Sequence, residues 1–262
     1  MQKNSKWVYL WDVIYPVGMY LVISNIVMFL LGLVAPANNE NYIVRHIIVS
    51  VVSLPFILSY YRRPPVYCIE VAEKKRIRPE AILLALAAGA AFGVALNNLI
   101  GLTPLVSWSA SYQEISEAFY GSTLILEILA TCVITPILEE LLYRGVAYQR
   151  LRGWLGILPA ILCSSLLFGV MHLNLVQFLY AGLIGALLAW LMEYFGLTAA
   201  TSAHVGANLI SVLRSECGIL SLSGMGMGGI VVETGIAAVL CVLSVWLLWR
   251  KVDRDYGGKY NG

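Results

Sequence analysis

Eight apolar runs, each about as long as a membrane-crossing helix, most constrain the fold of this 262-residue chain. Hydropathy windows of about 19 residues place them at 14–35, 43–61, 81–105, 122–146, 155–173, 176–195, 197–213 and 228–249. A helix needs about 20 predominantly apolar residues to cross a hydrocarbon core. The sequence therefore predicts an all-α, polytopic membrane helical bundle of about eight transmembrane helices, built as a single integral membrane domain over residues 1–262.

The composition excludes several classes of protein. Hydrophobic residues make up 60% of the chain and charged residues 12%, whereas soluble proteins contain about a quarter charged residues. The net charge is +2 and the basic residues are scattered over short loops, so we expect membrane lipids and no nucleic acid as partners. The first apolar run is longer than a signal-peptide core and lacks a small-residue cleavage site, so we expect it to be retained.

The basic residues give an independent check on the number of spans. Eight spans place both termini on one side, and Lys and Arg concentrate in cytoplasmic loops. Fifteen basic residues fall on that side: Lys3, Lys6, Arg62, Arg63, Lys74, Lys75, Arg76, Arg78, Arg144, Arg150, Arg152, Arg250, Lys251, Arg254 and Lys259. The other side carries Arg45 and Arg214. We therefore expect both termini and the loop 62–80 to be cytoplasmic.

Two segments between spans have distinctive compositions. Residues 106–121 alternate aromatic side chains with Glu114 and Glu117, which indicates either a short amphipathic helix at the outer interface or an ordinary external loop. The glycine-rich segment 221–229 is typical of a flexible external connector.

Ionisable side chains inside the spans are the first candidates for function, because burying them in a bilayer is costly. Glu139, Glu140, His172 and His204 fall within predicted spans. Four further acidic residues lie toward span ends, where water or headgroups can solvate them, and we expect structural roles for these: Asp12, Glu127, Glu193 and Glu233.

The stretch PILEELLYRG, residues 136–145, places two carboxylates beside an arginine. On a helix, Glu140 and Arg144 form an i,i+4 pair, while Glu139 points about 100° away. Arg144 can keep Glu140 charged, which leaves Glu139 free to titrate or to hold water as a general base does. The alternative is a juxtamembrane charge cluster that closes the fourth span.

Two further motifs carry histidine. In FGVMH, Phe168 lies on the same helical face as His172 and can wall it from lipid, although a single histidine at a span end is often structural. In SAHVGAN, His204 and Asn208 are one turn apart. They can donate two hydrogen bonds to one oxygen, as an oxyanion hole requires, or act as interhelical polar contacts. Together these side chains suit water activation and amide hydrolysis.

The three motifs, in this order, resemble those of the CPBP family of intramembrane proteases, also known as the CAAX protease and bacteriocin-processing or Abi family. The family pattern is EExxxR, then FxxxH, then HxxxN or HxxxD, and this chain has EELLYR at 139–144, FGVMH at 168–172 and HVGAN at 204–208. The resemblance covers a catalytic core of about 122–213. The first three spans and the last match only in general character.

The resemblance implies a function for each motif residue. It implies that Glu139 and His172 hold and activate the attacking water, while His204 and Asn208 stabilise the oxyanion. Glu140 would support the site through Arg144.

The resemblance leaves the cofactor open. Glu139, His172 and His204 are candidate zinc ligands, since two histidines and a glutamate leave the fourth position of zinc free. A metal-free glutamate mechanism uses the same side chains, and we favour it.

The resemblance also implies an endopeptidase that cuts a small peptide or a membrane-associated protein. The substrate would be either lipidated, as in CAAX processing, or a leader or bacteriocin-type peptide, and the latter fits the plasma membrane of a prokaryote. Two other functions stay open: a non-catalytic bacteriocin-immunity or interaction protein, and a proton-coupled transporter. Transporters often have duplicated halves, and the first half of this chain contains no corresponding motif.

The predicted spans leave the motifs at different depths. If the helices are straight, Glu139 lies near the cytoplasmic third of its span and His172 near the outer end of the next. Proline kinks, or continuation of the fourth span toward Arg152, would move the glutamates deeper. We therefore predict that the following residues converge in one polar cavity: Glu139, His172, His204 and Asn208.

Overall fold

The computed structural model describes residues 6–35, 38–66, 79–119, 122–219 and 221–256, and these ranges contain helices and no strand. Each predicted span corresponds to one long helical segment, so the all-α polytopic bundle is confirmed. The segments are α1 (Lys6–Val34), α2 (Asn39–Tyr61), α3 (Pro79–Gly101), a composite helix over 124–155, α9 (Ile157–Val170), α10 (Leu175–Phe195), α11 (Leu197–Cys217) and α12 (Gly226–Tyr256).

Five described helices are individually long and apolar enough to cross a membrane: α1, α2, α3, α10 and α12. The other spans depart from that simple pattern for identifiable reasons. α9 has only 14 residues, and α11 carries polar side chains along its length. These atypical helices contain the histidine motifs.

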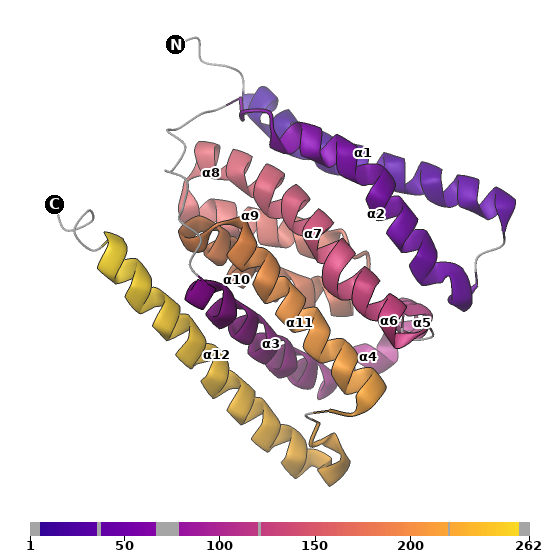
Figure 1. Cartoon of the computed structure of the whole chain (residues 1–262), viewed down its shortest axis with the longest axis vertical. Helices are drawn as coiled ribbons and strands as arrows, with labels where there is room; N and C mark the ends of the chain where they lie inside the picture. The colour runs from indigo at the N-terminus through magenta and orange to yellow at the C-terminus, as the bar shows by residue number, and fades with distance from the viewer. Residues whose placement is uncertain (1–5, 36–37, 67–78, 120–121, 220, 257–262) are drawn as a thin grey trace.

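The helices alternate in direction across the bundle (Figure 1). α1 and α2 form an antiparallel pair on one side, and α3 packs between α11 and α12 on the other. The start of α1 and the ends of α2 and α12 lie at the same end of the bundle (Figure 1). Described basic residues gather there: Lys6, Arg62, Arg63, Arg150, Arg152, Arg250 and Lys251. The cytoplasmic assignment of this end stays a prediction.

Two corrections apply to the distribution of basic residues. Arg144 is wholly buried in the bundle and is not part of the cytoplasmic basic side. Most of the loop 62–80 lies outside the described residues, as do Lys3, Lys74, Lys75, Arg76, Arg78 and Lys259.

The segments between spans are largely helical. The described part of the stretch 106–121 is mostly covered by α4 (Leu105–Trp108) and α5 (Ala110–Phe119), so it is largely helical, and its place at the outer interface stays a prediction. The glycine-rich stretch 221–229 is not a continuous connector, because η3 (Ser223–Met225) lies within it and α12 begins at Gly226.

Close packing of α3 against α11 depends on two glycines. A Cβ at Gly89 would collide with the carbonyl oxygen of Ala203, and one at Gly206 with that of Leu86. Small residues allow such close backbone approach between membrane helices. Because Ala203 precedes His204, this packing also sets the position of the second histidine motif.

The four acidic residues near span ends are engaged by neighbouring groups. Glu127 is buried and accepts a hydrogen bond from the Ser122 amide at 3.2 Å. The other three form ion pairs: Asp12–Arg150 and Glu193–Arg152, both at 3.2 Å, and Glu233–Arg214. Each of these pairs joins different helices, which fits the structural roles expected for them.

Candidate active site

Both glutamates lie near the middle of one continuous helix from Leu124 to Leu155. Its parts are α6 (Leu124–Glu127), η1 (Ile128–Ile134), α7 (Thr135–Glu140), η2 (Leu141–Tyr148) and α8 (Gln149–Leu155), and the backbone is right-handed helical at every junction. The fourth span therefore does continue past Arg152. This extension places the glutamates deep in the bundle.

Pro136 explains the first widened, π-helical turn, η1. Proline has no N–H and its ring clashes with the carbonyl four residues earlier, and the Thr135 amide bonds to Ala130 O, five residues back. Pro136 has no N–H to offer Thr131 O. Asn208 Nδ2 donates to that oxygen at 2.6 Å instead. This bond ties α11 to the helix of the glutamates.

A compact charge cluster forms where α7 faces α11. Glu140 Oε1 lies 3.0 Å from Arg144 Nη1 and 2.9 Å from His204 Nδ1. On the other side of the imidazole, His204 Nε2 lies 3.7 Å from Glu139 Oε2. The side chains of Glu140 and Arg144 are 0% exposed and that of Glu139 is 18% exposed. The ring of His204 is thus held between a buried carboxylate and a partly accessible one.

Arg144 connects this cluster to α9 and α10. Its Nη2 donates to Gly185 O at 3.2 Å, and its guanidinium carbon lies 4.5 Å from the centre of the Phe168 ring. A Cβ at Gly185 would lie 3.2 Å from Arg144 Nη2 and 3.3 Å from the Phe168 ring. The glycine therefore leaves room for the arginine.

His172 reaches the same region because α9 is short. Fourteen residues rise about 21 Å, less than the roughly 30 Å of a hydrocarbon core, and His172 follows the end of α9. Its Nδ1 lies 2.9 Å from Phe168 O. Since a carbonyl oxygen only accepts, Nδ1 donates in this contact, which leaves Nε2 for another partner.

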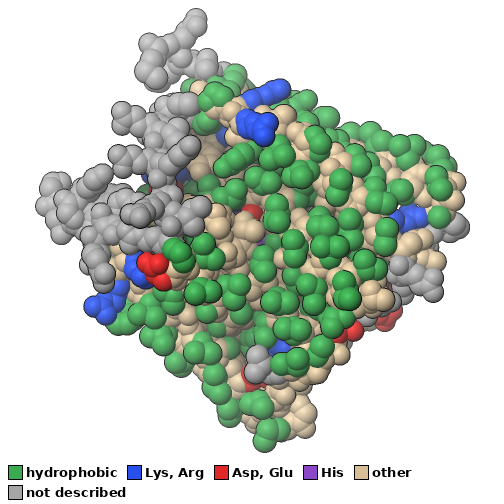
Figure 2. Space-filling view, viewed as in Figure 1, with side chains coloured by type: hydrophobic (Ala, Val, Ile, Leu, Met, Phe, Trp, Pro, Cys, Tyr) green, Lys and Arg blue, Asp and Glu red, His purple; other side chains and the backbone are tan. Residues whose placement is uncertain are grey.

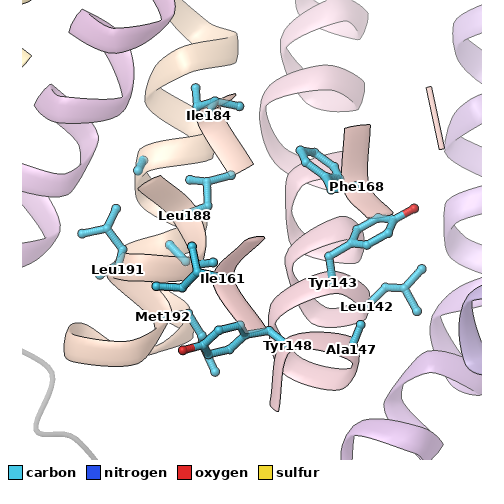
Figure 3. Packing of buried hydrophobic residues seen from close by; sticks show 14 of the residues in the cluster. Leu142, Tyr143, Ala147, Tyr148, Ile161, Phe168, Ile184, Leu188, Leu191 and Met192 are labelled. Atoms are coloured by element: carbon cyan, nitrogen blue, oxygen red, sulfur yellow. The ribbon is translucent and has the colours of Figure 1, made fainter. Parts of the chain in front are cut away.

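Phe168 lies beside Tyr143 in the buried hydrophobic cluster (Figure 3), and its ring contacts both motif histidines. Its ring meets that of His172 edge-on at 5.0 Å and that of His204 edge-on at 5.8 Å. It is 1% exposed and also contacts Tyr143, with ring centres 4.9 Å apart. Phe168 thus contacts both imidazoles and helps to shield them.

The structure brings together most of the residues predicted for the site. Glu139, Glu140, Arg144 and His204 are linked directly, and His172 is linked through Phe168. Asn208 lies one turn from His204, with its amide engaged by Thr131 O. On the face drawn in Figure 2, an acidic and a histidine side chain show between hydrophobic ones, over α7 and α11.

One apolar groove lies away from the motifs. It has a volume of about 430 Å³ and runs along the surface of α12, lined by Ala238, Val239, Val242, Leu243 and Trp246. All five are apolar and none belongs to a motif. Convergence of the motif residues in a single polar cavity stays a prediction.

Several site residues were missed by sequence reasoning. Tyr143 packs on Phe168, Gly185 accepts from Arg144, and Asn174 donates to His172 O at 3.1 Å. Tyr143 lies inside the first motif, four residues after Glu139. Asn174 directly precedes an apolar run, which is typical of a helix N-cap. No local signal identifies Gly185.

The candidate zinc ligands are Glu139, His172 and His204. Among the described residues, no group of three or more His, Cys, Asp or Glu side chains is placed to hold a metal ion. The Nδ1 atoms of His172 and His204 both have protein partners, Phe168 O and Glu140. A histidine that binds zinc usually donates its other ring N–H to a carbonyl or a carboxylate, so these contacts are compatible with binding through Nε2, and the choice between zinc and a metal-free site stays a prediction.

Fold and site together define a polytopic helical membrane protein with a carboxylate and histidine centre inside its bundle. Residues 121–210 match the family model described as type II CAAX prenyl endopeptidase Rce1-like. The matched segment contains all three motifs, so the resemblance to the CAAX protease family is confirmed over it. No curated protein and no solved structure matches the chain.

Proposed function

We propose that this protein is an intramembrane endopeptidase that hydrolyses a peptide bond of a small peptide or a membrane-associated protein. The observation that supports this most is the His204 imidazole held between Glu140 and Glu139. This arrangement lies within the segment that matches a family of proteases.

The charges of the cluster define the role of His204. Glu139, Glu140 and Arg144 together carry one excess negative charge when ionised. The oxyanion role that we propose for His204 requires a proton on each ring nitrogen, because Nδ1 is engaged by Glu140. The imidazolium then donates from Nδ1 to Glu140 and presents Nε2–H on the side of Glu139.

Water activation falls to Glu139 and His172. Glu139 has the more accessible carboxylate of the pair, and it accepts a proton from water as the oxygen attacks the scissile carbonyl carbon. His172 accepts a hydrogen bond from the same water through Nε2, because its Nδ1 is engaged by Phe168 O.

The carbonyl oxygen becomes an oxyanion in this step. His204 Nε2–H and the second amide N–H of Asn208 would donate to it. Glu139 then returns its proton to the leaving nitrogen, the C–N bond breaks, and a carboxylate and an amine are released. The proposed mechanism uses only protein side chains and water.

The substrate we propose is a segment that reaches the site from the membrane or from its cytoplasmic side. It is either lipidated near its C-terminus or a leader or bacteriocin-type peptide. We place the protein in the plasma membrane of a prokaryote.

The test is cleavage of quenched fluorescent peptides, with and without a C-terminal isoprenoid, by protein purified in detergent. Glu139→Gln should lower kcat/KM by roughly a hundredfold or more, the scale of a lost general base. Glu193→Gln is the matched control, because Glu193 is bound by Arg152 and Tyr148 away from the motifs. Equal cleavage by Glu139→Gln and wild type would overturn the assignment.

A second arm repeats the assay with a zinc chelator. Unchanged activity supports the metal-free mechanism, and activity that is lost and then restored by zinc overturns it. Cleavage of only one peptide class identifies the substrate chemistry.

A further inference from the structure

The turn between α9 and α10 holds His172 through contacts that the proposed mechanism does not use. α9 ends at Val170 and α10 begins at Leu175, with His172 between them. Leu173 has a φ of 59°, in the left-handed region that residues other than glycine rarely occupy. Neighbouring groups must stabilise such a conformation.

Leu173 does not stabilise the turn by its own packing. Its side chain is 84% exposed, so it contributes little contact with the bundle. Asn174, in contrast, is 7% exposed and is hydrogen-bonded on both sides of its amide. Besides the main-chain hydrogen bonds from His172 to Gly169 and from Leu173 to Val170, the side-chain contacts that hold the turn come from Asn174.

The side chain of Asn174 joins the two helices. Its Oδ1 accepts from the Gln177 amide at 2.8 Å, which caps the start of α10. Its Nδ2 donates to His172 O at 3.1 Å and also contacts Gln177 Oε1. The carbonyls that follow a helix end lack intrahelical partners, and inside a bilayer water does not supply them.

These contacts fix the main chain of His172 at both of its polar atoms. The His172 amide donates to Gly169 O at 3.1 Å, and its carbonyl accepts from Asn174. With the main chain held, the ring directs Nδ1 to Phe168 O at 2.9 Å. The hydrogen bond at one ring nitrogen decides which of the two nitrogens carries the proton. With the proton on Nδ1, Nε2 is left as an acceptor.

We propose that Asn174 is a positioning residue for the reaction. Acting through the carbonyl of His172, it keeps the imidazole in the Nδ1–H form, with Nε2 available to the attacking water. This inference rests on the proposed function and adds the residue that orients one of its two water-binding groups.

The test separates the two hydrogen bonds of Asn174. Asn174→Ser keeps an acceptor for the Gln177 amide, since serine caps helices about as well as asparagine, but it removes the amide donor to His172 O. Asn38→Ser is the matched control, because Asn38 caps α2 by accepting from the Asn41 amide at 2.9 Å, away from the site.

Three properties would be measured for each variant: kcat and KM, the thermal midpoint, and ¹⁵N spectra of the histidines. The chain has only three histidines, so the His172 signal can be assigned by substitution. We expect Asn174→Ser to lower kcat about tenfold to a hundredfold, the scale of a misplaced reacting group, with KM within about twofold. The Nε2–H form of His172 should appear, while the thermal midpoint matches that of Asn38→Ser.

Wild-type kcat and an unchanged His172 tautomer in Asn174→Ser would overturn the proposal. A fall in kcat that follows a lower thermal midpoint, with the tautomer unchanged, would also overturn it, because Asn174 would then be purely structural. The tautomer is measured without turnover. If Glu139→Gln cleaves peptide as well as the wild type, the proposed function is wrong. The ¹⁵N spectra of Asn174→Ser still show whether Asn174 sets the tautomer of His172.

Discussion

Arg144→Met should destabilise the protein strongly, because it leaves a buried carboxylate without its cation. Arg144 and Glu140 are both 0% exposed and lie 3.0 Å apart. Removing one partner of such a pair costs about 3–5 kcal/mol. Glu140 would keep only its contact with His204 Nδ1.

A double variant separates the cost of the unpaired charge from the loss of contacts. Glu140→Leu with Arg144→Met replaces the pair by apolar side chains, which is often close to neutral. Gly185 O loses its donor in both variants, so what the double variant loses in addition is the partner of His204 Nδ1, at about 1–3 kcal/mol. The double variant should therefore be more stable than Arg144→Met alone.

The assay is reversible unfolding in mixed detergent micelles, followed by the fluorescence of the seven tryptophans. Arg152→Met is the matched control, because Arg152 is 30% exposed in its pair with Glu193; at such sites the loss is about 1 kcal/mol or less. If Arg144→Met costs no more than Arg152→Met, or if the double variant is as unstable as Arg144→Met, the argument from the buried charge is wrong.

Two further predictions concern the placement of α11. Gly89→Ala should lower the free energy of unfolding by about 1–3 kcal/mol and also lower cleavage, because the added methyl collides with Ala203 O beside His204. Gly18→Ala is the control, because its methyl meets open space, and it should change the free energy of unfolding by no more than about 0.5 kcal/mol. Equal effects of the two substitutions would show that close packing at Gly89 does not matter. Asn208→Ala should cost about 1 kcal/mol in micelle unfolding, because Thr131 O loses its donor, and peptide cleavage should fall with it; wild-type cleavage would show that Asn208 does not contribute to the reaction.

The sequence determined the membrane class and the helical segments, because the length of an apolar run and the cost of burying charge act locally. The i,i+4 spacing also predicted the contact between Glu140 and Arg144, since a helix fixes that distance whatever surrounds it. Three motifs in order were enough to indicate the protease family that residues 121–210 match.

The depth of the site was decided by the tertiary structure. Hydropathy windows ended the fourth span near residue 146, because they register apolar length and not whether a basic side chain is enclosed. Arg144 is enclosed by Glu140, Gly185 O and Phe168, so it continues the helix inside the bundle and does not end it at the membrane surface.

The hydrogen-bond partners of the motif residues were likewise set by neighbouring helices. Phe168 was predicted to wall His172 from lipid, and the structure adds a contact with the ring of His204 on α11, which spacing along α9 could not indicate. Asn208 binds Thr131 O because Pro136, on another helix, lacks the N–H that would otherwise be available. Spacing along one helix fixes which side chains share a face, whereas only the packing of several helices fixes which atoms those side chains meet.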